Sequence, residues 1–136
     1  MMSENHYEGK LSKGTELSAG YDLRATIAVD IPAGDRALVS TGVRVEIASG
    51  QFGMVCSRSG MALKHGVSVL SAPGIIDSDY RGQIGVILIN HSKYPYHVGV
   101  GDKVAQLVVT AHGSFTEGVV GSVTERGEGG FGSTGK

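Results

Sequence analysis

The sequence has few of the residues that build disulfide-rich, zinc-binding or membrane-spanning proteins. Its 136 residues include one cysteine, Cys56, three prolines and no tryptophan. A single cysteine excludes an internal disulfide and a cysteine-based zinc site. It also favours a reducing compartment, so we expect a cytoplasmic protein, with a nuclear location and a viral or phage origin still open. No apolar run approaches the length of a membrane span, and residues 1–13 predict no secretory signal.

An excess of positive charge is also missing. The 12 Lys and Arg residues face 13 Asp and Glu residues, which gives a net charge of -1. Proteins that bind nucleic acid through bulk charge are strongly basic, so we expect neither a nucleic-acid partner nor a membrane partner. The five histidines show no metal-ligand spacing, and no residue pattern supports a nucleophilic covalent mechanism.

The pattern that is present predicts an all-β protein of one domain. Apolar residues make up 40% of the chain, which suits a folded core. Short β-type segments are separated by Gly, Pro, Asp or Asn, as in a sandwich or barrel. These segments are 27–31, 36–40, 43–47, 51–57, 66–70, 84–89 and 104–110. One short helix is expected over residues 60–65, with Gly66 just beyond its end.

The composition changes near Gly121. Six of the last sixteen residues are glycine, and the large apolar side chains there are Val123 and Phe131. We therefore expect a core over residues 1–120 and a glycine-rich C-terminal arm over residues 121–136. Arg126 and the isolated Phe131 suit an arm that wraps an anion and stacks on a base, although a plain disordered tail has the same composition.

The segment Ser57-Arg58-Ser59-Gly60 leads into the predicted helix. A helix N-terminus offers unpaired N–H groups, and arginine, serine and glycine add a guanidinium, a hydroxyl and close backbone approach. Together these groups indicate a phosphate site. The alternative is an N-cap serine beside a surface arginine.

Two further segments contain polar residues in unusual places. Residues 72–82 resemble a hairpin whose arms meet near Asp77 and Tyr80, and Asp77 and Asp79 would share one face of a strand. Ordinary turn chemistry explains the same residues. Gln106 interrupts an apolar strand, so its amide either faces water, has a partner in a binding site, or makes a satisfied core hydrogen bond.

These segments together resemble the trimeric dUTPases, whose five motifs occur here in order. They are AGYDLRA at 19–25, RSGMA at 58–62, GIIDSDYRG at 74–82, GDKVAQL at 101–107 and RGEGGFGSTG at 126–135. The resemblance implies a jelly-roll-like β-barrel with one short helix and a flexible arm. It also implies a homotrimer that hydrolyses dUTP to dUMP and pyrophosphate, with Mg²⁺ carried on the triphosphate. That reaction keeps uracil out of DNA and supplies dUMP for dTMP synthesis.

The resemblance also implies roles for individual residues. Asp77 aligns the attacking water and holds the 3′-hydroxyl of the deoxyribose, and Tyr80 excludes a 2′-hydroxyl. Asp22 contacts the water shell of Mg²⁺. The phosphates and water are held by Arg58, Ser59, Gly60 and Gln106. The uracil edge is read by the backbone from Ser71 through Gly74, Ile75 and Ile76, with Gly85. A neighbouring subunit's arm supplies Arg126, Phe131, Gly132 and Ser133.

Two other functions would require different residues. A dCTP deaminase-like relative would need a glutamate as its acid–base group where Ile87 stands, and a threonine where Gly85 stands. A non-catalytic sheet protein with a docking tail would not need Asp77 or Gln106, and both are present. Ser71 stands where several dUTPases carry asparagine.

Overall fold

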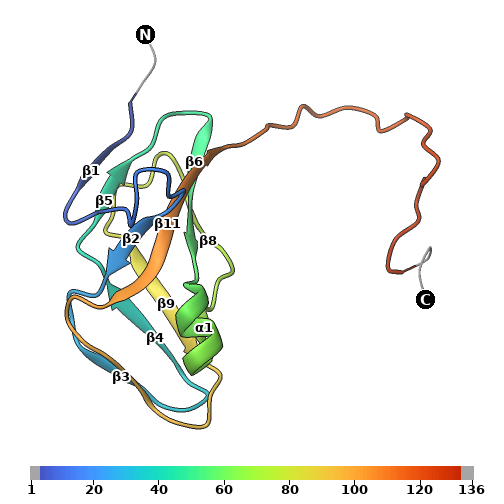
Figure 1. The fold of residues 1–136 in the computed structure, drawn as a ribbon. Coiled ribbons are helices and arrows are strands. Elements are labelled where there is room, and N and C mark those ends of the chain that lie inside the picture. Colours follow the sequence, from blue (N-terminus) through green and yellow to red (C-terminus); the bar gives the residue numbers. More distant parts are fainter. Residues whose placement is uncertain (1–3, 133–136) are drawn as a thin grey trace.

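The computed structural model describes residues 4–132 as eleven strands and one helix (Figure 1). The strands are β1 (His6–Glu8), β2 (Tyr21–Arg24), β3 (Val29–Ile31), β4 (Arg36–Ser40), β5 (Arg44–Glu46), β6 (Gln51–Cys56), β7 (Val67–Val69), β8 (Gly74–Ile76), β9 (Gly85–Asn90), β10 (Tyr96–Val98) and β11 (Lys103–Ala111). The all-β class with one short helix is therefore confirmed.

All strand pairs are antiparallel, and they form four open sheets within the described residues. The largest sheet has the order β2-β11-β6-β8, and a second has the order β4-β9-β7. β1 pairs with β5, and β10 pairs with β3. β11 forms the longest ladder, from Gln106 opposite Cys56 to Ala111 opposite Gln51. A single jelly-roll-like barrel stays a prediction.

One apolar cluster fills the space between the sheets. Along residues 43–47, Val43, Val45 and Ile47 are buried, whereas Arg44 and Glu46 are exposed, which is the period of two of a half-buried strand. The most deeply buried large side chains are Leu23, Ile31, Ile84, Leu88 and Leu107. These residues come from β2, β3, β9, β11 and the segment before β9, so all parts of the body share the core.

The helix α1 (Ser59–His65) covers one end of this core (Figure 1). Met61 is its buried residue, and Gly66 ends it in the left-handed conformation, as the sequence predicts. No helix within residues 4–132 is long and apolar enough to cross a membrane.

The hairpin expected over residues 72–82 is wrong. β8 pairs with β6, where Ile76 lies opposite Gly53, and β9 pairs with β4 and β7. The chain between β8 and β9 therefore joins two sheets. Because β8 ends at Ile76, Asp77 and Asp79 lie in a turn and do not share a strand face.

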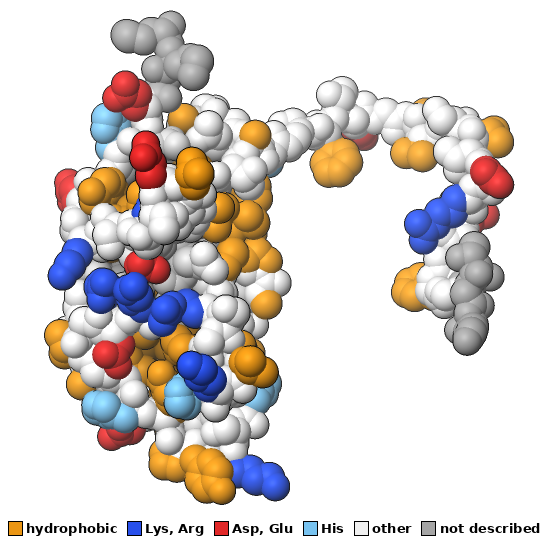
Figure 2. Space-filling view, viewed as in Figure 1, with side chains coloured by type: hydrophobic (Ala, Val, Ile, Leu, Met, Phe, Trp, Pro, Cys, Tyr) orange, Lys and Arg blue, Asp and Glu red, His pale blue; other side chains and the backbone are white. Residues whose placement is uncertain are grey.

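Beyond β11 the chain leaves the body of the protein. The last strand ends at Ala111, and His112 still donates its N–H to the Gly50 oxygen at 3.1 Å. Residues 113–132 then run away from the sheets in an extended path (Figure 1). Phe115, Val119, Val120, Val123 and Phe131 are fully exposed along it. Figure 2 shows hydrophobic side chains along this segment, clear of the body. We call residues 113–132 the arm, and it starts before the composition change at Gly121.

Candidate functional site

Gln106 lies at the centre of a polar group on the large sheet. It sits on β11 opposite Asp22 of β2 on one side and Cys56 of β6 on the other. Its side-chain Nε2 donates a hydrogen bond to the backbone oxygen of Ser57 at 3.1 Å. The Nε2 of the amide is thus bonded to the backbone, and the strand pairing brings together residues of the first and fourth motifs, beside Ser57, which directly precedes the second motif.

The other residues of this group are held by short contacts. Lys103 Nζ lies 3.5 Å from Asp22 Oδ2, and the Asp22 side chain is 17% exposed. Gly20 packs directly on the Gln106 amide, so any larger residue there would displace it. We call Asp22, Ser57, Arg58, Lys103 and Gln106 the Gln106 cluster.

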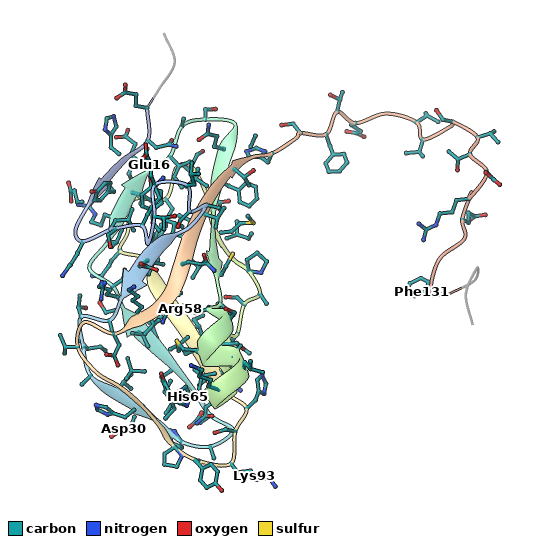
Figure 3. The ribbon with its side chains drawn as sticks, in the orientation of Figure 1. Glu16, Asp30, Arg58, His65, Lys93 and Phe131 are labelled. Carbon is teal, nitrogen blue, oxygen red and sulfur yellow. The ribbon has the colours of Figure 1, made fainter. Side chains whose placement is uncertain are left out.

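Arg58 links this cluster to the helix. It occupies the N-cap position of α1 with extended backbone angles, and no side chain caps the helix. Its Nη1 donates to the backbone oxygen of Lys103 at 3.3 Å, and Figure 3 shows it at the start of the helix. The N-cap serine alternative is wrong, because Ser57 Oγ accepts the N–H of Val69 at 2.9 Å. Ser59 and Gly60 form the exposed first turn of α1.

A concave surface of about 430 Å³ opens beside Arg58. It is lined by Arg24, Arg58, Met61, Tyr96, Gly101, Asp102 and Lys103. Three cations face one carboxylate there, and the Asp102 carboxylate already accepts the N–H of Gly99 at 2.8 Å. A protein of near-neutral net charge thus presents a locally cationic surface, which suits a polyanion. Figure 2 shows a band of basic side chains on this face of the body.

Tyr96 adds a neutral donor to this surface. Burial raises the pKa of its phenol above the ordinary value, the nearby Asp102 raises it further, and Arg58 opposes them. The phenol therefore stays protonated at neutral pH. Tyr96 could not be predicted from the sequence, because a tyrosine in a short strand has no motif around it.

The loop after β8 forms a second, separate pocket of about 170 Å³. It is lined by Ile75, Ile76, Asp77, Tyr80, Gln83, Ile84 and Gly85. Gly74 begins β8, and Ser71 lies in the exposed bend before it, outside this pocket. Five residues of the predicted site therefore do meet around one pocket: Ile75, Ile76, Asp77, Tyr80 and Gly85.

Tyr80 is fixed at the edge of this pocket. Its hydroxyl donates to the backbone oxygen of Gln83 at 2.8 Å, and its ring packs over Gly82. A side chain at position 82 would collide with that ring, which explains why glycine follows Arg81. Gln83 was missed by sequence reasoning, yet its Oε1 accepts hydrogen bonds from Ser40 Oγ and from Gly42 N.

Within one chain the two groups lie apart. Ile76 pairs with Gly53 and Gln106 pairs with Cys56, so they are three positions apart along β6, roughly 10 Å. Asp77 lies beyond the Gly53 end of this part of β6, and Arg58 lies beyond the Cys56 end. One chain therefore presents two half-sites that face different regions of its surface.

The arm contributes to neither half-site of its own chain. Figure 3 shows Phe131 at the far end of the arm, remote from Arg58. The arm forms a local turn in which Arg126 Nε donates to the backbone oxygen of Gly129 at 2.6 Å. Phe131 and Gly132 follow with positive φ angles of 52° and 80°. Ser133 lies outside the described residues.

The described residues hold no group of three side chains able to cage a metal ion. Asp22 is the carboxylate nearest to Gln106 along the sheet, with Lys103 as its ion-pair partner. This donor set suits a metal that is bound mainly by a ligand's phosphates, with one carboxylate contacting its water shell.

Comparisons with known proteins agree with this geometry. The model of the dUTPase family matches residues 9–135. The chain is 48% identical to a deoxyuridine 5'-triphosphate nucleotidohydrolase of Anaeromyxobacter sp., over 90% of this chain and 84% of that protein. It is 46% identical to the protein of the same name from Candida albicans, over 95% of this chain and 83% of that one.

Solved structures share the fold over nearly the whole length. The dUTPase of Staphylococcus bacteriophage 80alpha with dUpNHpp superposes with a TM-score of 0.89 at 25% identity, covering 98% of this chain and 99% of that one. The EIAV dUTPase superposes with a TM-score of 0.79 at 30% identity, covering 89% and 99%. With a family model that spans most of the sequence and relatives near half identity, the chain belongs to the dUTPase family.

Proposed function

We propose that the protein is a dUTP diphosphatase that hydrolyses dUTP to dUMP and pyrophosphate. The observation that carries the proposal is the pair of half-sites in a dUTPase-family chain: a cationic surface beside Arg58 and a small pocket at Asp77. The first suits a triphosphate, and the second suits a base and sugar. Water attacks the α-phosphorus, and the bond to the bridging oxygen breaks, so that pyrophosphate leaves.

The residues of the Gln106 cluster would bind and orient the phosphates. Arg58 offers a guanidinium already held by the Lys103 carbonyl, and Ser59 and Gly60 offer the open first turn of α1. Gln106 is fixed through its Nε2, so its oxygen would accept a hydrogen bond from bound water or from the substrate. Orientation of this kind lowers the barrier without a covalent intermediate.

The turn after β8 would supply the base and the sugar contacts. Asp77 would accept a proton of the attacking water and hold the 3′-hydroxyl, and it is exposed where it lines the pocket. Tyr80, fixed over Gly82, would exclude a 2′-hydroxyl by its ring. The backbone of Ser71, Gly74, Ile75, Ile76 and Gly85 would read the uracil edge.

Magnesium would enter with the substrate. When bound, Mg²⁺ supplies neutralisation of the charge that develops on the phosphates. Asp22 would contact its water shell, and Lys103, whose Nζ lies 3.5 Å from Asp22 Oδ2, would orient that carboxylate.

The separation of the half-sites supports a shared site in a homotrimer. A complete site would combine the Gln106 cluster of one subunit with the Asp77 turn of a second. The exposed arm would then bring Arg126, Phe131, Gly132 and Ser133 to a neighbouring subunit and close the site. The jelly-roll-like closure of the sheets and the cytoplasmic location belong to the same proposal.

The experiment is a panel of nucleotides with Mg²⁺ and a pyrophosphate assay. We expect turnover of dUTP and little turnover of UTP, dCTP or dTTP. A deaminase would instead release ammonia from dCTP, which is not expected because apolar Ile87 stands at the acid–base position. Absence of pyrophosphate from dUTP would refute the proposal.

A further inference from the structure

The turn that carries Asp77 and Tyr80 has few backbone hydrogen bonds of its own. Residues 77–84 belong to no strand. Tyr80 N donates to the Asp77 oxygen at 3.1 Å, and Ile84 N donates to the Val43 oxygen at 2.8 Å. A segment outside the sheet ladders keeps one conformation only if side chains hold its backbone.

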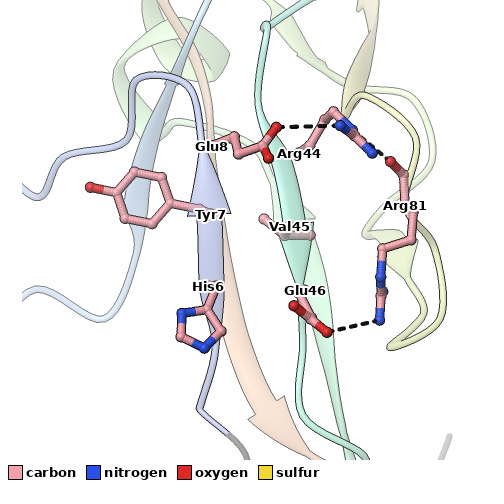
Figure 4. Close-up of a pocket in the computed structure, with 7 residues that line it drawn as sticks. All are labelled: His6, Tyr7, Glu8, Arg44, Val45, Glu46 and Arg81. Carbon is pink, nitrogen blue, oxygen red and sulfur yellow. Dashed lines mark hydrogen bonds and ion pairs between the residues drawn. The ribbon is translucent and has the colours of Figure 1, made fainter.

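Arg81 is the side chain that holds most of this turn. Its Nη1 donates to the backbone oxygen of Ser78 at 2.6 Å and to that of Tyr80 at 3.2 Å. Its Nη2 lies 3.6 Å from Glu46 Oε1 on β5, as the dashed line in Figure 4 shows. The guanidinium therefore connects the turn to a strand whose other face is packed in the core.

Arg44 holds the same residue through its backbone. Its Nε donates to the Arg81 oxygen at 2.8 Å, and its Nη1 lies 3.3 Å from Glu8 Oε2 (Figure 4). Glu8 on β1 pairs directly opposite Arg44 on β5. These contacts connect Glu8 on β1 to Arg44 on β5, and Arg44 to the turn.

The turn has two sides with different residues. Asp77 and Tyr80 line the pocket that would take the base and sugar. Ser78, Asp79 and Arg81 line a concavity of about 480 Å³ on the side of β5. Arg81 therefore acts on the pocket through the turn and does not line it.

We propose that Arg81, anchored by Glu46 and Arg44, is a positioning residue that holds the Asp77 carboxylate and the Tyr80 ring in their working places. This inference rests on the proposed function. The side chains of both ion pairs are 48–75% exposed to solvent, so the pairs contribute little to stability. The reaction rate is more sensitive to the positions of the catalytic groups, because a misplacement of about 1 Å can lower the rate roughly 100-fold.

The test compares Arg81→Met with the native protein, using kcat and KM for dUTP and UTP and the thermal unfolding midpoint. Arg36→Met is the matched control, because Arg36 is an exposed arginine that begins β4 and lies outside the turn. Tyr80→Ala gives the reference for lost sugar discrimination. Arg81→Lys is the conservative variant, because an ammonium can donate to the same two carbonyls.

For Arg81→Met we expect kcat for dUTP to fall by about 10- to 100-fold, with a smaller change in KM and an unchanged unfolding midpoint. The preference for dUTP over UTP should fall about tenfold, toward that of Tyr80→Ala. Arg81→Lys should recover most of kcat, and Arg36→Met should match the native protein.

Native kinetics in Arg81→Met would overturn the inference. So would an equal loss for dUTP and UTP that follows a lowered unfolding midpoint, because that is the result of a purely structural role. A native protein that leaves dUTP intact would instead refute the proposed function, and the native reaction in the same series distinguishes the two failures.

Discussion

The body and the arm differ in what surrounds their apolar side chains. In the body, Leu23, Leu88 and Leu107 are at most 1% exposed, and every sheet contributes to one core. In the arm, Phe115 and Phe131 are fully exposed and contact no core of their own chain. The body therefore supplies the free energy of folding, whereas the apolar residues of the arm have no use within one chain and indicate a second partner.

The backbone entropy that is lost on ordering is a second difference between the body and the arm. Each residue fixed in one conformation costs about 1–2 kcal/mol of backbone entropy. The glycine-rich end of the arm buries no apolar surface that would offset it. We therefore expect the arm to order only when a substrate and a neighbouring subunit provide contacts.

The largest effect should come from the body's own pocket. Asp77→Asn keeps the shape of the side chain but removes the charge that would accept a proton from water. We expect kcat for dUTP to fall by about 10³-fold while binding and the unfolding midpoint stay near native. Steady-state kinetics and dUTP titration measure this, and near-native kcat would contradict the role of Asp77.

Removal of the arm's end should come next. Truncation after Glu125 removes Arg126 and Phe131 and leaves the core intact. We expect a loss of about 100-fold in kcat/KM with unchanged unfolding and assembly, because closure over the substrate is lost. Full turnover by the truncated chain would show that the arm has no catalytic use.

Substitution of an apolar residue should lower the free energy of unfolding much more in the body than in the arm. Leu88→Ala creates a cavity in the core and should lower the free energy of unfolding by about 2–5 kcal/mol. Val123→Ala in the exposed arm should change it by less than about 0.5 kcal/mol. Denaturant unfolding of both variants measures the difference, and similar losses would mean that the arm packs on its own body.

The smallest effect should come from a single arm side chain. Phe131→Ala removes the ring expected to stack on the base, which is worth roughly 1–3 kcal/mol. We expect kcat/KM to fall about tenfold, with Val123→Ala as the control that keeps native activity. An unchanged kcat/KM would assign closure of the site to Arg126 and the glycines.

The sequence predicted the longer elements well because their patterns repeat. The strand over residues 36–40 and the helix end at Gly66 match the structure, and both depend on local signals. The strands β1, β2 and β10 were missed, because each is three or four residues long and no longer β-type apolar run surrounds it.

The site residues were predicted from motifs, but their spatial grouping was not. The hairpin expectation failed because β8 pairs with β6, a partner about twenty positions earlier in the chain. Arg44, Gln83 and Glu46 also escaped notice, since their hydrogen bonds join segments far apart in sequence. Such contacts depend on the tertiary fold and leave no local pattern.

A shared site requires that the arm of one subunit completes the site of another. Mixed refolding of two inactive variants tests it most directly: Asp77→Asn with a complete arm, and the truncation after Glu125 with an intact Asp77. Native mass spectrometry confirms that mixed trimers form. We expect dUTP turnover to reappear in the mixture well above that of either parent refolded alone, because an intact Asp77 then meets an intact arm. Confirmed mixed trimers with no more activity than the parents would contradict it.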